Sequence, residues 1–218
     1  PRREWWNNLR DVEKVFYGIL FTNACVYLAW KVPAFRNTLQ MYFTDHTLKT
    51  PLYLPMLLNA FSHYSVIHLG INMYVLSSFS TGLSTTLKGE EFLAFYMSAA
   101  VFSSFTSLCL KVLRGSKNAS VGASGAIFAI FALFATTYPN ANLQIVLIPN
   151  FTFTAEKGLI GAMCLDFVGM LFNWKIFDHA SHFGGALFGL WYAKWGRNFL
   201  RNNRIKLAQK WHDLRSKK

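Results

Sequence analysis

A serine between glycines is the residue of this chain best suited to act as a nucleophile. Ser124 lies in the stretch 119–132, ASVGASGAIFAIFA, with Gly122 two residues before it and Gly125 directly after it. Glycine has no Cβ, so a loop that contains it can turn sharply and bring backbone N–H groups close to a reacting atom. Such a serine can attack a carbonyl carbon, and nearby N–H groups can stabilise the oxyanion that forms.

The other groups that acyl transfer requires occur in two further apolar segments. His182 can serve as the general base, and His68 and Asn72 can both donate hydrogen bonds. His68 and Asn72 are four residues apart, so they project from one face of a helix. Taken singly, each polar residue is explained as well by helix packing or an interhelical hydrogen bond. Together with Ser124 they supply a nucleophile, a general base and oxyanion donors.

The composition indicates the kind of scaffold that holds these residues. Of the 218 residues, 53% are hydrophobic and only 15% are charged, whereas a soluble domain carries about 25% charged residues. The predicted fold class is therefore all-α, a polytopic membrane protein. The formal net charge of +12 gathers at the two ends and in short loops. This distribution favours contact with anionic lipid over binding to a nucleic acid.

Apolar segments define the predicted spans. Six transmembrane helices are expected, at residues 15–30, about 63–79, 92–110, 124–138, 158–174 and 179–195. The third is stopped by Lys111, Arg114 and Lys117. An apolar lead-in, 52–61, precedes the second span, and the loop 31–51 is expected to reach the membrane interface. We divide the chain into an interfacial segment, 1–14, a six-helix domain, 15–196, and a basic amphipathic tail, 197–218.

Small residues predict which spans touch. Gly185 and Gly189 follow His182 at helical spacing along the sixth span. The fourth span offers a matching face of small residues, Gly125, Ala129 and Ala132. Such faces let two helices approach closely. A close crossing of these spans would bring His182 to Ser124.

Three motifs together resemble the rhomboid family of intramembrane serine proteases. They are HxxxxHxxxN from His63 to Asn72, GxSG from Gly122 to Gly125, and HxxGxxxG from His182 to Gly189. They occur in the family's order, and the residues that flank the last two motifs resemble the mitochondrial branch of the family. The resemblance implies a serine endopeptidase of the mitochondrial inner membrane that cleaves single-pass transmembrane proteins without a metal or cofactor. The chain begins at Pro1 rather than Met, so we expect it to be part of a longer protein with a further upstream span.

The resemblance also implies a role for each motif residue. Ser124 would be the nucleophile and His182 its base, with no required carboxylate, while His68, Asn72 and the Ser124 N–H form the oxyanion hole. The residues expected to support the site are His63, Gly122, Gly125, Phe128, Gly185 and Gly189. Of these, His63 is expected to bond a neighbouring loop. Phe128 stands where a tyrosine is frequent in the family, so it keeps a face to stack on the histidine ring but lacks the hydroxyl. An arginine motif found in the first loop of many bacterial relatives is not evident in 31–51.

Asp166 lies near the middle of the fifth predicted span. A carboxylate at that depth usually faces the protein interior, pairs with another group or marks a functional path. We interpret it either as an interhelical hydrogen-bonding residue or as a modulator of the site. In both cases Asp166→Asn is expected to change activity only partially.

Three other functions fit the sequence less well than a protease does. Zinc could be bound by four histidines and one aspartate, His63, His68, His179, His182 and Asp178, but no HExxH pair is present. A catalytically inactive rhomboid-like binder of transmembrane helices would usually lack the serine or the histidine, and both stand here. A transporter is disfavoured because intramembrane charges are few and no paired broken helices repeat in two halves.

Overall fold

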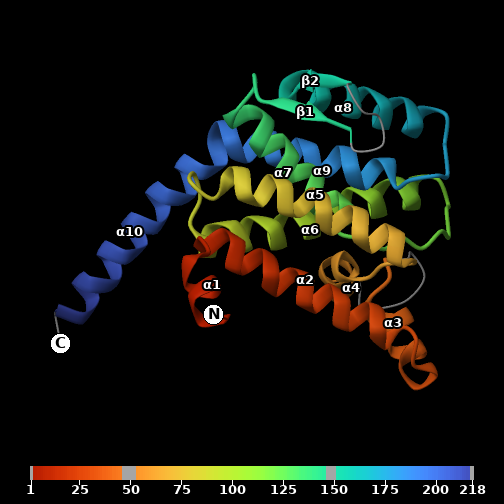
Figure 1. Ribbon diagram of the computed structural model, residues 1–218, viewed down its shortest axis with the longest axis horizontal. Coiled ribbons are helices and arrows are strands. Elements are labelled where there is room, and N and C mark those ends of the chain that lie inside the picture. The colour runs from red at the N-terminus through yellow and green to blue at the C-terminus, as the bar shows by residue number, and fades with distance from the viewer. Residues whose placement is uncertain (1, 46–52, 146–150, 217–218) are drawn as a thin grey trace.

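The computed structural model describes residues 2–45, 53–145 and 151–216, and almost all of them belong to helices (Figure 1). The α-helices are α1 (Arg2–Asn8), α2 (Asp11–Ala29), α3 (Arg36–Tyr42), α4 (Tyr53–Leu58), α5 (Val66–Leu83), α6 (Gly89–Leu113), α7 (Ser124–Thr137), α8 (Ala155–Leu171), α9 (His179–Trp191) and α10 (Arg197–Ser216). Short 3-10 turns occupy Pro33–Phe35 and Asn59–Phe61, and a π-helical turn, Tyr192–Gly196, joins α9 to α10. A small antiparallel hairpin pairs β1 (Asn142–Gln144) with β2 (Thr152–Thr154).

Helix α7 is the centre of the bundle. It packs against α9, α6, α5 and α8, and eight of its 14 residues are buried. Alanines and glycine account for much of that buried surface, so neighbouring helices approach α7 closely on several sides. In Figure 1 the helix α2 lies along one edge of the bundle and α8 along the other. The fourth predicted span is thus the element around which the others are arranged.

The start of α7 is set by Gly122. This residue has a φ of +131°, a left-handed conformation that disfavours residues with a Cβ. Its N–H donates to the carbonyl of Asn59 at 3.0 Å, which ties the loop to the turn before α5. The helix then begins at Ser124 and ends at Thr137, just before Pro139.

The helix that carries His68 begins later than predicted. We expected it to start near His63, but α5 starts at Val66. Ser65 is the cap: its hydroxyl accepts a hydrogen bond from the His68 N–H at 3.1 Å. His63 therefore belongs to the extended segment that leads into the helix. The apolar lead-in contains α4 and the turn Asn59–Phe61, although residue 52 and residues 46–51 of the preceding loop lie outside the described part.

Three helices of the described residues, α2, α5 and α6, are long and apolar enough to cross a membrane by themselves. The helix α7 is apolar but has only 14 residues, a rise of about 21 Å against a hydrocarbon core of about 30 Å. The count of six spans accordingly stays a prediction. Figure 1 shows α10 extending away from the bundle, and none of its residues is buried. It is anchored where Arg197 Nε lies 2.7 Å from the Glu91 carboxylate of α6.

Candidate active site

The serine and the histidine singled out from the sequence are in direct contact. The Ser124 Oγ lies 2.8 Å from the His182 Nε2, although 58 residues separate them along the chain. Each residue stands in the first turn of its helix, Ser124 on α7 and His182 on α9. The two N-terminal helix ends therefore meet at one point. A hydroxyl at this distance from an imidazole nitrogen has the geometry that a nucleophile and its general base require.

Backbone contact between α7 and α9 brings the pair together. A Cβ added to Gly185 would collide with the carbonyl oxygen of Gly125, and one added to Gly189 would collide with the carbonyl oxygen of Ala129. Nothing larger than hydrogen fits at either position unless the helices separate. The expected small-residue crossing of these two helices is thus present, and it sets the separation at which His182 meets Ser124.

An aromatic ring and a carboxylate hold the His182 ring in place. Phe128, one turn after Ser124, stacks on it with ring centroids 4.3 Å apart and an interplanar angle of 7°. The Asp166 Oδ1 lies 3.3 Å from the His182 Nδ1 on the opposite edge of the ring from Ser124. A neutral ring that donates from Nδ1 to the carboxylate presents its Nε2 lone pair to the serine hydroxyl. The network of partners thus assigns the tautomer that a general base needs.

Asp166 also contacts a histidine that the sequence analysis had considered only as a zinc ligand. The His179 Nδ1 lies 2.7 Å from the same Asp166 Oδ1. Both imidazoles and the carboxylate are buried. The expectation that this carboxylate faces the interior and bonds another helix is met, because α8 carries Asp166 and α9 carries both histidines. The spacing DHASH was the signal for His179, since it lies one turn before His182.

His68 reaches the site, while Asn72 is turned toward its own helix. A Cβ on Gly122 would lie 2.9 Å from the His68 Cε1 and 3.9 Å from the Ser124 Oγ, so both side chains face the space beside this glycine. The Asn72 Nδ2 donates to the His68 carbonyl at 3.1 Å. Unlike His68, Asn72 does not line the cavity at Ser124. The oxyanion role of Asn72 stays a prediction.

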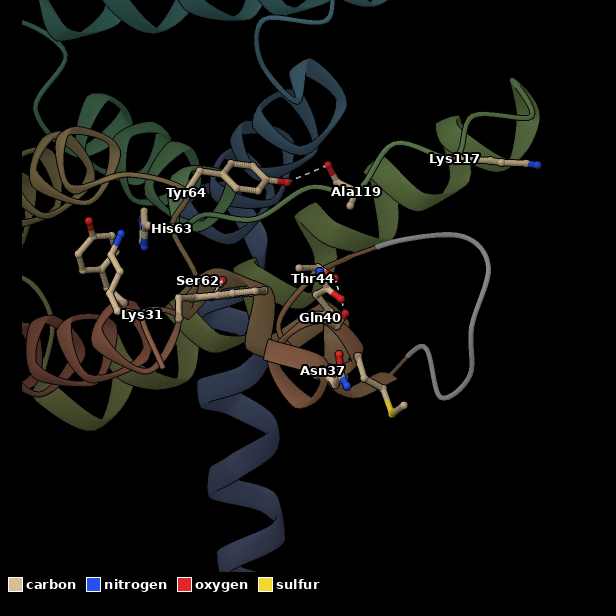
Figure 2. A pocket seen from close by; sticks show the side chains of 12 residues that line it. Lys31, Asn37, Gln40, Thr44, Ser62, His63, Tyr64, Lys117 and Ala119 are labelled. Carbon is tan, nitrogen blue, oxygen red and sulfur yellow. Dashed lines mark hydrogen bonds between the residues drawn. The ribbon is translucent and has the colours of Figure 1, made fainter. Parts of the chain in front are cut away.

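His63 does not make the loop contact that we expected. Its ring packs edge-on against His68, with centroids 4.9 Å apart, and it is only 3% exposed. Neither ring nitrogen has a hydrogen-bond partner within the described part of the chain. Burial, with a smaller contribution from the neighbouring His68, lowers the pKa of His63 to about 3. Figure 2 shows His63 beside Lys31 and Tyr64 at a second cavity of about 860 Å³.

Ser124 and His182 open onto a cavity of about 570 Å³. Its walls come from α5 at Ile67 and Ile71, from α8 at Met170, from the segment 173–178 before α9, and from the end of α6 with the loop to α7, within residues 107–121. The side chains named from α5 and α8 are apolar, whereas the end of α6 and the loop to α7 add polar and charged groups. Chain segments entering between α5 and α8 would therefore meet an apolar surface that leads to the serine.

The zinc set considered from the sequence does not assemble. Within residues 2–45, 53–145 and 151–216, no three His, Cys, Asp or Glu side chains are grouped as metal ligands. His179 and His182 share Asp166 instead, and Asp178 bonds Ser107 and the N–H of Ser181. Asp178 is the N-cap of α9. Sequence reasoning missed this role, and it treated Lys111, which contacts Asp178, only as the stop of a span.

Comparison with known proteins places these motifs in a family context. The family model described as "Rhomboid domain" matches residues 52–198. The chain is 44% identical over 213 residues to proteins named "Presenilin-associated rhomboid-like protein, mitochondrial" from Rattus norvegicus and Homo sapiens, which covers 98% of this chain and 56% of each relative. It is 29% identical over 204 residues to "Rhomboid protein 1, mitochondrial" from Saccharomyces cerevisiae, covering 91% of this chain and 59% of that protein. The chain thus spans about half the length of the curated relatives it matches.

Proposed function

The chain belongs to the rhomboid family, and we propose that it is an intramembrane serine endopeptidase that cleaves single-pass transmembrane proteins. The observation that carries this proposal is the 2.8 Å contact between the Ser124 Oγ and the His182 Nε2 at the wall of an apolar cavity. Relatives named as mitochondrial support a place in a mitochondrial membrane, which we propose to be the inner membrane. The exposed basic helix α10 is proposed to contact anionic lipid.

In this proposal His182 takes the hydroxyl proton as Ser124 attacks the scissile carbonyl. The imidazolium that forms is stabilised by the buried Asp166 carboxylate on its Nδ1 side. His182 then gives its proton to the leaving amine, which releases the C-terminal product. Water entering the cavity hydrolyses the acyl-enzyme by the same proton route in reverse. Asp166 touches the base rather than the reacting atoms, so it is a positioning residue, and His179 holds it from the other side.

The oxyanion of the tetrahedral intermediate would form beside the N-terminus of α7. The N–H of Ser124 is the first of that helix, where backbone N–H groups lack intrahelical acceptors and favour negative charge. The His68 ring stands next to Gly122 on the same side of the serine. These two groups are the proposed donors, with Asn72 reaching the site only if its amide leaves the His68 carbonyl.

Substrate would enter as an unwound segment. The amides of a continuous transmembrane helix are bonded internally, so its carbonyls are closed to attack. The cavity at Ser124 is lined by apolar side chains of α5 and α8 and by polar and charged ones from the end of α6 and the loop to α7. We therefore expect cleavage near small or helix-breaking residues of the substrate, where a few residues can leave the helix at low cost.

The test is cleavage of a single-span model substrate in lipid vesicles by the purified protein and by Ser124→Ala. We expect the alanine variant to lose at least ~10³-fold in kcat. Ser78→Ala is a matched control, because Ser78 is an exposed serine of α5 that bonds only its own helix. A fluorophosphonate should label the wild type and not Ser124→Ala. Wild type that binds the substrate without cleaving it would favour the inactive binder instead.

A further inference from the structure

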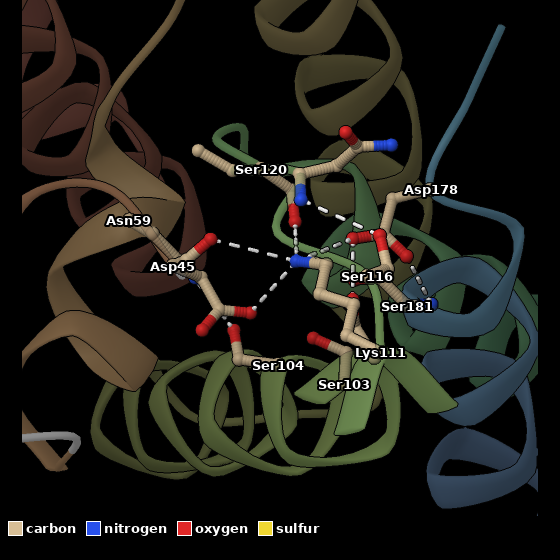
Figure 3. Close-up of polar contacts among 12 residues, drawn as sticks. Asp45, Asn59, Ser103, Ser104, Lys111, Ser116, Ser120, Asp178 and Ser181 are labelled. Atoms are coloured by element: carbon tan, nitrogen blue, oxygen red, sulfur yellow. Dashed lines mark hydrogen bonds and ion pairs between the residues drawn. The ribbon is translucent and has the colours of Figure 1, made fainter. Parts of the chain in front are cut away.

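One lysine joins the loop that precedes the nucleophile to the helix that carries the base. Figure 3 shows the Lys111 ammonium, from the last turn of α6, between Asp45, Ser120 and Asp178. The Lys111 Nζ lies 3.3 Å from the Asp45 Oδ2 and 3.6 Å from the Asp178 Oδ2, and it donates to the Ser120 Oγ. These three partners come from three segments that are far apart in the sequence.

Two of the partners stand four residues before Ser124 and His182. Ser120 precedes Ser124 by four residues, and Asp178 precedes His182 by four. Asp178 caps α9: its Oδ1 accepts from the Ser181 N–H at 3.1 Å and its carbonyl accepts from the His182 N–H at 3.1 Å. On the other side, Ser120 and Asp45 exchange two backbone hydrogen bonds of 2.9 Å. Movement of either segment relative to Lys111 would therefore be passed to Ser124 or to His182.

Three charged side chains meet at this junction. The Lys111 side chain is 11% exposed and faces two carboxylates, of which Asp45 is 2% and Asp178 20% exposed. Burial acts to raise the pKa of Asp178, but the charge of Lys111 and hydrogen bonds from Ser107, Ser120 and the Ser181 N–H outweigh it and leave the pKa lowered. The carboxylate is thus ionised near neutral pH. Without the ammonium, the Asp178 carboxylate would lose the cation that lowers its pKa while still facing the buried Asp45 across the junction.

We propose that Lys111 is a positioning residue for the cleavage reaction, which orients Ser124 and His182 within the spacing that α7 and α9 impose by holding Ser120 and Asp178 to one ammonium. This inference rests on the proposed protease function. Lys111 lines the cavity at Ser124, but its ammonium is engaged by Asp45, Ser120 and Asp178, so we expect its removal to act more on the chemical step than on substrate binding. A misplacement of about 1 Å can cost ~10²-fold in rate even when its cause lies away from the reacting atoms.

The first test compares Lys111→Met with Lys117→Met, in purified protein in lipid vesicles with a single-span model substrate. Both variants replace a lysine by methionine, but Lys117 is exposed in the loop that follows α6. Rates are divided by the number of sites that a fluorophosphonate labels, so unfolded protein does not count. We expect kcat per labelled site to fall at least ~10-fold in Lys111→Met with KM changed less than about twofold, and both to be retained in Lys117→Met.

A second substitution, which removes the charge of Asp178, tests whether Lys111 acts through that charge or only supports the fold. In Lys111→Met/Asp178→Asn the amide still accepts the Ser181 N–H through its Oδ1, but no charge remains at residue 178 to be neutralised. We expect kcat per site in the double variant to exceed that of Lys111→Met by at least ~3-fold. If Lys111→Met yields no folded protein, Ser120→Ala is measured instead. It detaches the serine loop from the ammonium without exposing a charge, and we expect kcat to fall about 3-fold or more at constant KM.

The outcomes distinguish this inference from the function on which it rests. Wild type without Ser124-dependent cleavage would refute the proposed protease. Active wild type with an unchanged kcat per site in Lys111→Met would refute the positioning role alone, as would an unchanged kcat in Ser120→Ala if that variant has to be used. A fall in kcat that Asp178→Asn does not relieve would overturn the charge mechanism.

Discussion

The two sides of the catalytic pair are built in opposite ways. On one side α7 and α9 meet through Gly125, Gly185 and Gly189 with backbone against side-chain-free backbone. On the other side α5, the end of α8 and the segment before α9 contribute apolar side chains, several of them exposed, to the lining of a cavity of about 570 Å³. The α7–α9 contact has no room for an inserted group, whereas the cavity has room for one.

This difference answers two demands that the proposed protease function makes. A nucleophile and a base must keep a fixed separation, which a contact without flexible side chains provides. A substrate must reach them from the membrane, which requires helices that are not locked together. The bundle meets both demands by placing Ser124 and His182 at the edge where the closed contact ends and the cavity begins.

Breaking the closed side should have the largest effect. Gly185→Leu places a side chain against the Gly125 carbonyl, so α7 and α9 must separate. We expect the midpoint of thermal unfolding to fall and cleavage to drop at least ~10²-fold, because overpacking costs about 1–3 kcal/mol and displaces His182. Gly161→Leu in α8 is the matched control, since a Cβ there meets nothing within 4 Å. Equal activity of the two variants would contradict the closed contact.

Changes on the cavity side should lower kcat without lowering stability. We expect His68→Phe to reduce kcat by ~10²–10³, the usual cost of losing one oxyanion donor. Asn72→Ala should cost less, because its amide bonds the His68 carbonyl and does not line the cavity. Single-turnover cleavage measures both. A larger loss in Asn72→Ala would show that its amide moves to the oxyanion when substrate binds.

Replacing Asp166, which contacts the His182 ring, should have an intermediate effect on kcat. Asp166→Asn keeps an oxygen that can accept from the His182 Nδ1 but loses the charge that stabilises the imidazolium. We expect kcat to fall about 10-fold, within the range that general acid–base catalysis contributes, with folding retained. Activity as low as that of Ser124→Ala, in protein with a wild-type unfolding midpoint, would show that the carboxylate is required rather than supportive.

The smallest effect is one of pH on stability. His63 has a pKa of about 3 in the folded protein against an ordinary value of 6.5. The unfolded chain therefore binds a proton at this site first as the pH falls, and the folded state loses stability below about pH 6.5. Between pH 7 and pH 5 the loss should be about 1–2 kcal/mol. Unfolding midpoints of wild type and His63→Phe across this range would test it, and parallel curves would contradict it.

Much of the site was predictable because its residues are polar in apolar surroundings. Ser124, His182 and their glycines were identified by type and spacing, and the stacking of Phe128 was expected from its place one turn after the serine. The start of α5 was misplaced by three residues, because the cap that Ser65 provides was not weighed against the apolar run. The hydrogen bond expected of His63 is not found in the described residues, since packing against His68 occupies its ring instead.

By itself the sequence determined the chemistry that is available and the helices that can touch, because residue type sets reactivity and small residues set the distance of closest approach. Only the tertiary structure decided which groups share a partner. Asp166 lies between two histidines, and Lys111 joins Asp45, Ser120 and Asp178. Such contacts depend on how helices rotate and end relative to one another, to within an ångström, and no periodicity along a single chain encodes that rotation.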